Sequence, residues 1–158
     1  MQSIKFLFVG KTDQKEVQTL LSEYQKRLSR FVQVEVEELP ALKQAKGFTP
    51  AEQKRREGEI ILKRINDSDE IVLLDERGSE LTSAEFATWI DQKLIRVPRK
   101  LVFVVGGAYG FSEEVYQTAS QRLSLSKMTF NHQMVRPFLV EQVYRAFTIL
   151  RGHPYHNQ

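Results

Sequence analysis

One segment, residues 101–132, constrains the fold more than any other part of the chain. An apolar run, LVFVV, leads directly into the glycine-rich segment GGAYG and then into Ser112-Glu113-Glu114. Such a run is typical of a strand buried in a parallel sheet, and acids after a serine are typical of a helix start. Glycines either let the backbone approach a ligand or only make a tight turn. The order strand, glycine turn, helix predicts a corner that can bind a ligand.

The rest of the chain alternates between strand and helix patterns. Strands are expected at residues 4–9, 32–36, 70–75 and 101–105, and helices at 14–28, 50–65, from 82, from 112 and up to about 150. Asp13 with Glu16, and Thr82 with Glu85, have capping-box spacing, while residues 76–78 (ERG) suggest a turn. Pro40 is expected to end the strand at 32–36 and to begin a loop at 40–50, and Pro98 precedes the strand at 101–105.

This alternation predicts an α/β fold, a three-layer α/β/α sandwich with a mostly parallel sheet of about five strands. Connection rules alone favour a flavodoxin-like, unknotted sheet with its site at the carboxyl ends of the strands. We expect one domain over residues 1–158, because a chain of this length fits a single core.

The composition and the apolar pattern limit the kinds of catalysis and of binding partner to expect. The chain has no cysteine, which excludes disulfides and thiol catalysis, and its net charge of +3 is too small to argue for a nucleic-acid partner. No apolar run reaches the ~20 residues of a membrane span, so a cytoplasmic protein is expected. The last predicted helix is apolar around more than one face, which favours a homodimer. Those apolar positions are Leu139, Val140, Val143, Tyr144, Phe147, Ile149 and Leu150.

No single motif identifies a function. GGAYG lacks the GxGxxG spacing of a dinucleotide site and the Lys-Ser/Thr of a phosphate-binding loop, and Asp75 in LLDERG is equally explained by turn chemistry. Five motifs in order, however, are LLDERG, GGAYG, LSLSKMTFNHQMVR, EQVYRA and HPYH. In this order and spacing they resemble the RlmH family of SPOUT methyltransferases over essentially the whole chain.

The resemblance implies an activity and a topology. Members of that family methylate N3 of a pseudouridine in the helix 69 stem-loop of 23S rRNA, with S-adenosylmethionine, as homodimers on the assembled ribosome. It also implies that the C-terminal third forms a trefoil knot, in place of the unknotted sheet that connection rules favour.

The resemblance implies a donor site made by three loops. Apolar walls and close backbone suit an adenine ring, and no metal is expected, because a sulfonium already activates the methyl group. The implied cofactor-binding residues are Leu74, Gly106, Leu125, Ser126, Lys127, Met128, Thr129 and Phe130.

Proton transfer and RNA contact suggest further candidates. The acceptor N3 must lose a proton, for which His132, Tyr155, His156 and also His153 are candidates, while Arg136 and Arg145 suit phosphate or anion contacts. Each has a structural alternative: His132 can cap the last helix, Arg145 can pair with Glu141, and the tail can be frayed. Basic residues that suit rRNA phosphates, or only a solvated surface, are Lys43, Lys46, Lys54, Arg55, Arg56 and Arg77.

Three competing interpretations remain. The first is a SPOUT methyltransferase that acts on another RNA such as tRNA. The second is a non-catalytic, flavodoxin-like module that binds a flavin or nucleotide. The third is a ribosome-associated factor that binds rRNA without modifying it.

Overall fold

A five-stranded parallel sheet forms the centre of the computed structural model, which describes residues 2–42, 45–96 and 100–157. Its strands are β1 (Ser3–Val9), β2 (Gln33–Leu39), β3 (Glu70–Glu80), β4 (Leu101–Val105) and β5 (Gln121–Ser124). They lie in the order β2-β1-β4-β3-β5, and each neighbouring pair is parallel. The predicted α/β class and parallel sheet are therefore confirmed.

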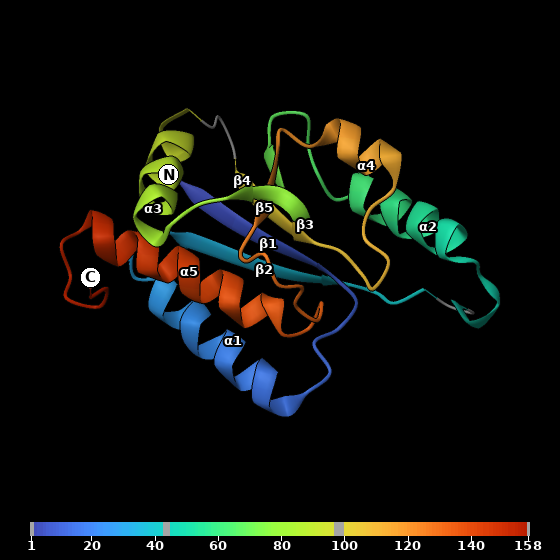
Figure 1. Cartoon of the computed structure of the whole chain (residues 1–158), viewed down its shortest axis with the longest axis horizontal. Coiled ribbons are helices and arrows are strands. Elements are labelled where there is room, and N and C mark those ends of the chain that lie inside the picture. Colours follow the sequence, from blue (N-terminus) through green and yellow to red (C-terminus); the bar gives the residue numbers. More distant parts are fainter. Residues whose placement is uncertain (1, 43–44, 97–99, 158) are drawn as a thin grey trace.

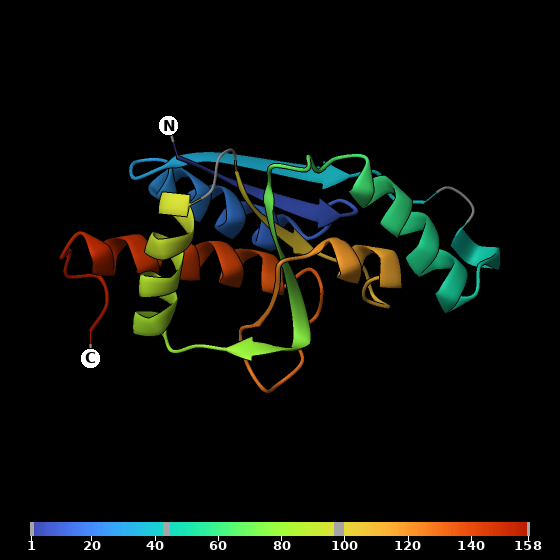
Figure 2. The same cartoon turned by 90° about the horizontal axis from the view of Figure 1, so that it is seen from above.

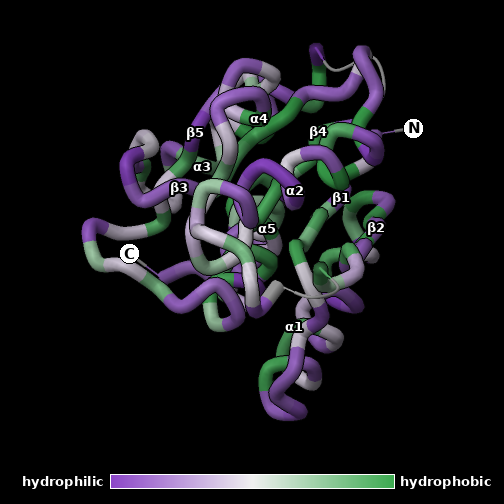
Figure 3. The backbone as a smooth tube through the Cα atoms, turned by 90° about the vertical axis from the view of Figure 1, so that its right-hand side faces the viewer, coloured by the Kyte–Doolittle hydropathy of each residue, from purple (hydrophilic) through white to green (hydrophobic). Residues whose placement is uncertain are grey.

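Helices cover both faces of the sheet (Figure 1, Figure 2). One face carries α1 (Lys15–Leu28), α3 (Ser83–Arg96) and α5 (Val135–Leu150), and the other carries α2 (Pro50–Leu62) and α4 (Glu113–Thr118). A short 3-10 helix, Ala45–Gly47, precedes α2. Side chains alternate across the sheet, so Phe6 and Phe103 face the first helix layer while Leu7 and Val104 face the second. In Figure 3 the tube is largely green, or hydrophobic, along β1 and β4, which lie inside the sheet.

The strand order differs from the flavodoxin-like order that connection rules favoured. In the structure β4 lies between β1 and β3, and β5 pairs with the outer side of β3. The flavodoxin-like expectation is therefore wrong. Periodicity along the chain reports which residues form strands, but it carries no information about which strands become neighbours.

The expected turn at residues 76–78 is also wrong, because β3 continues to Glu80. Leu123 of β5 pairs first with Leu74 and again with Ser79, so residues 75–78 form a bulge between two paired parts of β3. A bulge uses polar and glycine residues as a turn does, but it keeps the chain in the sheet. Its effect is to move residues 75–77 toward the cavity described below.

The two proposed capping boxes have opposite outcomes. Thr82 and Glu85 exchange the expected bonds, from Thr82 N–H to Glu85 Oε1 at 2.8 Å and from Glu85 N–H to Thr82 Oγ1 at 3.1 Å. The box at Asp13 and Glu16 is wrong: Gln14 is the N-cap of α1 and its side chain makes no cap bond. The Asp13 N–H donates to Gln133 Oε1 instead, so a residue from the C-terminal part of the chain fixes the start of α1.

Candidate functional site

A cavity of about 410 Å³ lies at the carboxyl ends of β3, β4 and β5. This volume is within the usual range for a small-molecule site, and the position is where ligands bind in open parallel sheets. Of the predicted cofactor residues, Lys127 is not among those lining the cavity, and the other seven are. They are Leu74, Gly106, Leu125, Ser126, Met128, Thr129 and Phe130. The structure thus brings three distant loops together, and binding itself stays a prediction.

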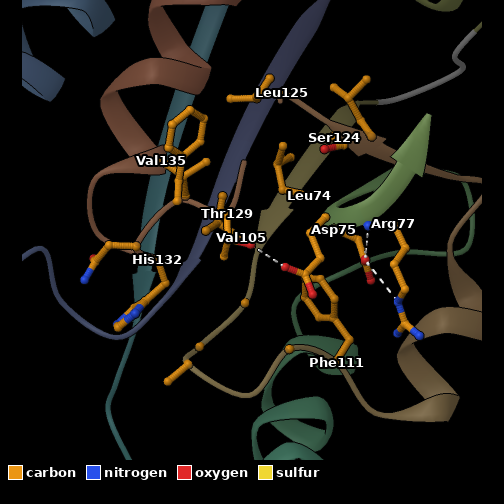
Figure 4. A pocket seen from close by; sticks show the side chains of 18 of the residues that line it. Leu74, Asp75, Arg77, Val105, Phe111, Ser124, Leu125, Thr129, His132 and Val135 are labelled. Carbon is orange, nitrogen blue, oxygen red and sulfur yellow. Dashed lines mark hydrogen bonds and ion pairs between the residues drawn. The ribbon is translucent and has the colours of Figure 1, made fainter. Parts of the chain in front are cut away.

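Apolar side chains form one side of the cavity. Figure 4 shows Leu74, Val105 and Leu125 around its inner part, with Val135 from the start of α5 beside them. Phe111 closes the lower side, where its ring packs edge-on against Tyr116 at 5.8 Å between centroids. This arrangement can hold a flat, weakly polar ring by contact and exclude water from it.

Serine and threonine hydroxyls shape the segment after β5. Ser124 Oγ donates to the Ser126 carbonyl at 2.7 Å, and the Met128 N–H donates to Ser126 Oγ at 3.0 Å. Thr129 Oγ1 donates to Glu76 Oε2 at 2.7 Å, which joins this segment to the β3 bulge. These local bonds take the place of the backbone hydrogen bonds of a regular strand or helix. The small polar residues that make them have no periodic spacing, so the sequence beyond Ser124 shows neither a strand nor a helix period.

A carboxylate on the opposite side of the cavity is held in the ionised form. Asp75 accepts a hydrogen bond from the Tyr116 hydroxyl and one from the Arg77 backbone N–H at 2.8 Å. Burial alone would raise the pKa of Asp75, but these two bonds, with the charges of Arg77 and Arg122, lower it below its ordinary value. The Arg122 guanidinium also lies 4.0 Å from the Tyr116 ring centroid. The bulge of β3 is thereby fixed to α4.

Two glycines of the corner are constrained by their backbone conformation or by a close neighbour. Gly110 has a φ of +82°, a conformation that side-chain-bearing residues rarely adopt. A Cβ at Gly107 would lie 2.8 Å from both carboxyl oxygens of Glu57, which reaches the corner from α2. Glu57 is buried, burial raises its pKa, and its Oε1 has no hydrogen-bond partner among the described residues. A buried carboxyl group therefore supports the corner from behind.

His132 lines the cavity on the side opposite Arg77 (Figure 4). Burial lowers the pKa of His132 below its ordinary value, and the charge of Arg136 lowers it further, with a smaller opposing effect of Asp13. The imidazole is therefore neutral at pH 7 and has a nitrogen free to accept a proton. The alternative role of capping the last helix is not observed, since Met134 is the N-cap of α5 and no side chain caps it.

Arg136 lies in the interior, and its guanidinium joins the two ends of the chain. It donates to the carbonyls of Val9 at 2.8 Å and Gly10 at 2.9 Å, to Thr12 Oγ1 at 2.9 Å, and to the His132 carbonyl at 3.1 Å. The residue has no solvent exposure. This geometry contradicts the expected contact of Arg136 with phosphate or a reacting base, because its donors already bind the protein.

Arg145, Tyr155 and His156 lie together, but they do not line the cavity. Arg145 pairs with Glu141 at 2.6 Å, as helical spacing allowed, and contacts His156 Nδ1 at 3.1 Å. The Tyr155 hydroxyl donates to Glu141 at 2.9 Å, and its ring stacks on Tyr144 at 4.7 Å. Burial, with Tyr24 and Glu141, raises the pKa of Tyr155, so this hydroxyl stays protonated in the present arrangement.

The remaining candidates occupy separate surfaces. His153 lies beside the Phe31 ring at 5.4 Å between centroids, and Arg77 lines the cavity.

On α2, Arg55 pairs with Glu59 at 3.1 Å and Arg56 lies over the Phe48 ring. Lys46 and Lys54 are on the surface of the same region, whereas Lys43 and Pro98 lie outside the described residues.

Sequence reasoning did not single out Tyr116, Phe111 or Glu57, although all three shape the cavity or its wall. Tyr116 lies on α4 one helical turn after Ser112, whose side chain caps that helix, but this spacing does not point to the cavity. Glu57 gave no signal, since it lies within a charged helix.

Two general findings bear on the class of site. In the described residues, no three His, Asp or Glu side chains are grouped as a metal ion would require. No described helix has both the length and the apolar character needed to cross a membrane.

Comparison with known proteins gives consistent matches over the whole chain. A family model described as "Predicted SPOUT methyltransferase" matches residues 2–156. A protein of Parabacteroides distasonis named "Ribosomal RNA large subunit methyltransferase H" is 49% identical over 155 residues, 98% of this chain and 99% of the relative. One of the same name from Christiangramia forsetii is 48% identical over 156 residues, 99% of each chain.

A solved structure supports the fold. It is that of a probable methylase family protein from Haemophilus influenzae Rd KW20, with a TM-score of 0.51 and 14% sequence identity. The match covers 94% of this chain and 66% of that one, so the present chain spans just under two thirds of its length.

Proposed function

Because the chain belongs to the SPOUT methyltransferase family, we propose that it methylates N3 of a pseudouridine in the helix 69 stem-loop of 23S rRNA. S-adenosylmethionine is the proposed methyl donor and the assembled ribosome the proposed substrate, which places the enzyme in the cytoplasm. Relatives named as large-subunit ribosomal RNA methyltransferases cover nearly the whole chain. The observation that carries the proposal is the cavity in which seven of the eight predicted donor-binding residues meet.

The residues around the cavity fit such a donor. Leu74, Leu125 and Met128 provide apolar surface for an adenine ring, and the Gly106 corner brings backbone close to it. Asp75, held ionised by Tyr116 and Arg77, supplies negative charge beside a cationic ligand. When bound, the donor supplies a methyl group already activated by its sulfonium, so the protein has to position the acceptor and remove one proton.

His132 is the proposed proton acceptor for the N3 position. It is neutral at pH 7 and lines the cavity, whereas Arg136 cannot take part because it is buried. In our proposal Arg136 is a positioning residue: its Nε–H donates to the His132 carbonyl and fixes the backbone that carries the imidazole. A positioned base of this kind typically contributes a 10²- to 10⁴-fold rate increase.

The tail is proposed to act in a homodimer. Arg145, Tyr155 and His156 lie outside the cavity of their own chain, so they contribute to catalysis only by reaching the cavity of a second copy. The apolar surface of Met128, Phe130, Met134 and Phe138 near the start of α5 is consistent with a covered interface. The family also implies a trefoil knot in the C-terminal third.

Two measurements test the function. Titration with S-adenosylhomocysteine and, separately, with flavin mononucleotide distinguishes a methyl-donor pocket from a flavodoxin-like module: only the first ligand should bind. Mass mapping of helix 69 in ribosomes from a deletion strain should show one methyl group fewer, restored by the wild-type gene. A methyl group lost from tRNA instead, or from no RNA, would overturn the rRNA assignment.

A further inference from the structure

A basic groove lies at the C-terminal ends of α1 and α5, which point the same way in Figure 1. It consists of two adjoining hollows that share Arg27 and Arg30, the one nearer the tail enclosing about 530 Å³. We define the basic groove by five side chains and two aromatic rings. They are Lys26, Arg27, Arg30, Arg151 and His153, with Phe31 and Tyr144.

Most cations of the basic groove have no acidic partner among the described residues, and they line its two adjoining hollows. Arg27 pairs with Glu23 at 2.6 Å, but Lys26, Arg30 and Arg151 make no ion pair with any residue that the structure describes. Some basic side chains elsewhere do pair, as Lys5 does with Glu37 and Lys100 with Glu35. Exposed like charges gathered around one hollow repel one another and attract a polyanion.

Aromatic rings give the basic groove a second feature that suits RNA. Phe31 and Tyr144 are half-buried, and their rings lie 6.1 Å apart. The Arg27 guanidinium lies 5.0 Å from the Tyr24 ring and 5.9 Å from the Tyr144 ring. Cations beside aromatic faces are typical of sites that bind unpaired nucleotides, where rings contact bases and the cations contact phosphates.

We propose that the basic groove is a docking surface for the phosphate backbone of a single-stranded or loop segment of RNA, outside the cavity of its own chain. This inference rests on the proposed function, which supplies an RNA substrate, and it assigns a surface that the function leaves open. Arg30 and Arg151, from the two sides of the groove, make the phosphate contacts. The basic groove differs from the α2 surface, where Arg55 is already paired with Glu59.

The test uses the full-length protein with two double variants. Arg30→Gln/Arg151→Gln removes both charges from the groove, and Lys63→Gln/Arg96→Gln removes two exposed charges elsewhere as the matched control. Binding to intact ribosomes and to a helix 69 hairpin is measured over a series of salt concentrations. The groove variant should bind about tenfold more weakly, and the slope of log K against log salt should fall by about 1.4, or about 0.7 for each lost contact.

Three further readouts decide the interpretation. Affinity for S-adenosylhomocysteine should not change, and Arg30→Lys/Arg151→Lys should restore binding, since phosphate contact needs the charge. An unchanged affinity and slope in the groove variant would overturn the proposal. So would a loss found only in Lys54→Gln/Arg55→Gln on α2, or a change of oligomeric state in the groove variant, which would identify the groove as a contact between copies.

The failure of this inference can be distinguished from failure of the proposed function. If the wild type does not methylate helix 69 but the groove variant still loses RNA affinity, the reaction is wrong and the surface stands. If methylation occurs and the groove variant binds RNA normally, the reaction stands and the surface is wrong.

Discussion

The carboxyl group of Glu57 on α2 lies directly behind Gly107 of the glycine corner, so that a Cβ at position 107 would be 2.8 Å from each carboxyl oxygen. Helix α2 therefore holds the wall of the cavity in place, although Glu57 itself does not line it. This contact links the stability of the protein to the shape of the pocket.

Gly107→Ala should destabilise the fold by about 1–3 kcal/mol, because the added methyl group pushes against a buried side chain. Adding Glu57→Ala should recover part of that loss, since it removes the atoms that the methyl group meets. Urea unfolding and S-adenosylhomocysteine titration measure the two effects. Gly47→Ala is the control, because a Cβ there meets no atom within 4 Å. Equal effects at positions 47 and 107 would contradict the contact.

Glu57→Gln should change how stability depends on pH. Burial raises the pKa of Glu57, so the folded protein holds this proton more tightly than the unfolded chain does. As pH rises from the ordinary glutamate pKa through the raised one, the wild type loses this contribution to stability. The amide variant has no such loss, so its free energy of unfolding should increase relative to that of the wild type between acidic and neutral pH. Parallel curves would rule out a raised pKa.

Arg136→Met should destabilise the fold by about 3 kcal/mol or more, because it leaves the carbonyls of Val9 and Gly10 buried without donors. Arg136→Lys should restore little, since an ammonium cannot reach four acceptors in the same plane. Thermal unfolding measures both. Arg96→Met, an exposed position, should stay within about 0.5 kcal/mol of the wild type.

His132→Gln should lower kcat for methylation by about 10²-fold or more while the affinity for S-adenosylhomocysteine stays constant. Because the pKa of His132 is lowered, the wild-type rate should begin to fall only below the ordinary histidine pKa, and this acidic limb should be absent from the variant. Single-turnover rates from acidic to neutral pH measure this. A variant that keeps the limb would assign the base to another group.

Deletion of Gly152 to Gln158 should abolish RNA methylation and leave donor binding largely intact, because the tail does not line the cavity of its own chain. Tyr155→Phe is the milder companion: it keeps the ring stack on Tyr144 and removes only the hydroxyl bonds to Glu141 and Tyr24. Mixing the deletion variant with a His132→Gln variant should restore turnover in mixed dimers. Unchanged turnover of the deletion variant alone would refute the role of the tail.

The fold was predictable where local patterns carry the information. The apolar run of β4, the alternation in β2 and the Thr82-Glu85 box follow from periodicity and side-chain chemistry. The local patterns did not reveal which strands lie beside β4, since strand order depends on contacts between distant segments. The start of α1 was misassigned for the same reason: Gln133, far along the chain, binds the Asp13 N–H that local rules gave to a cap.

The candidate site was predictable in its loops and less so in its charges. The resemblance placed Leu74, Gly106 and the segment after β5 together, as the cavity shows. An arginine in a sequence does not reveal whether its partners are phosphates or carbonyls, so the burial of Arg136 was not foreseen. Tyr116 was missed because only the fold brings its hydroxyl to Asp75.

The Arg136 bonds also bear on the order in which the protein is completed during synthesis. The strands are all made before residue 136, but the carbonyls at the end of β1 must wait for this guanidinium. His132 and Val135, which close one side of the cavity, are fixed at the same late stage. A nascent chain that has not yet reached the start of α5 therefore cannot have a finished pocket, and binding of the proposed donor would report that synthesis has passed Arg136.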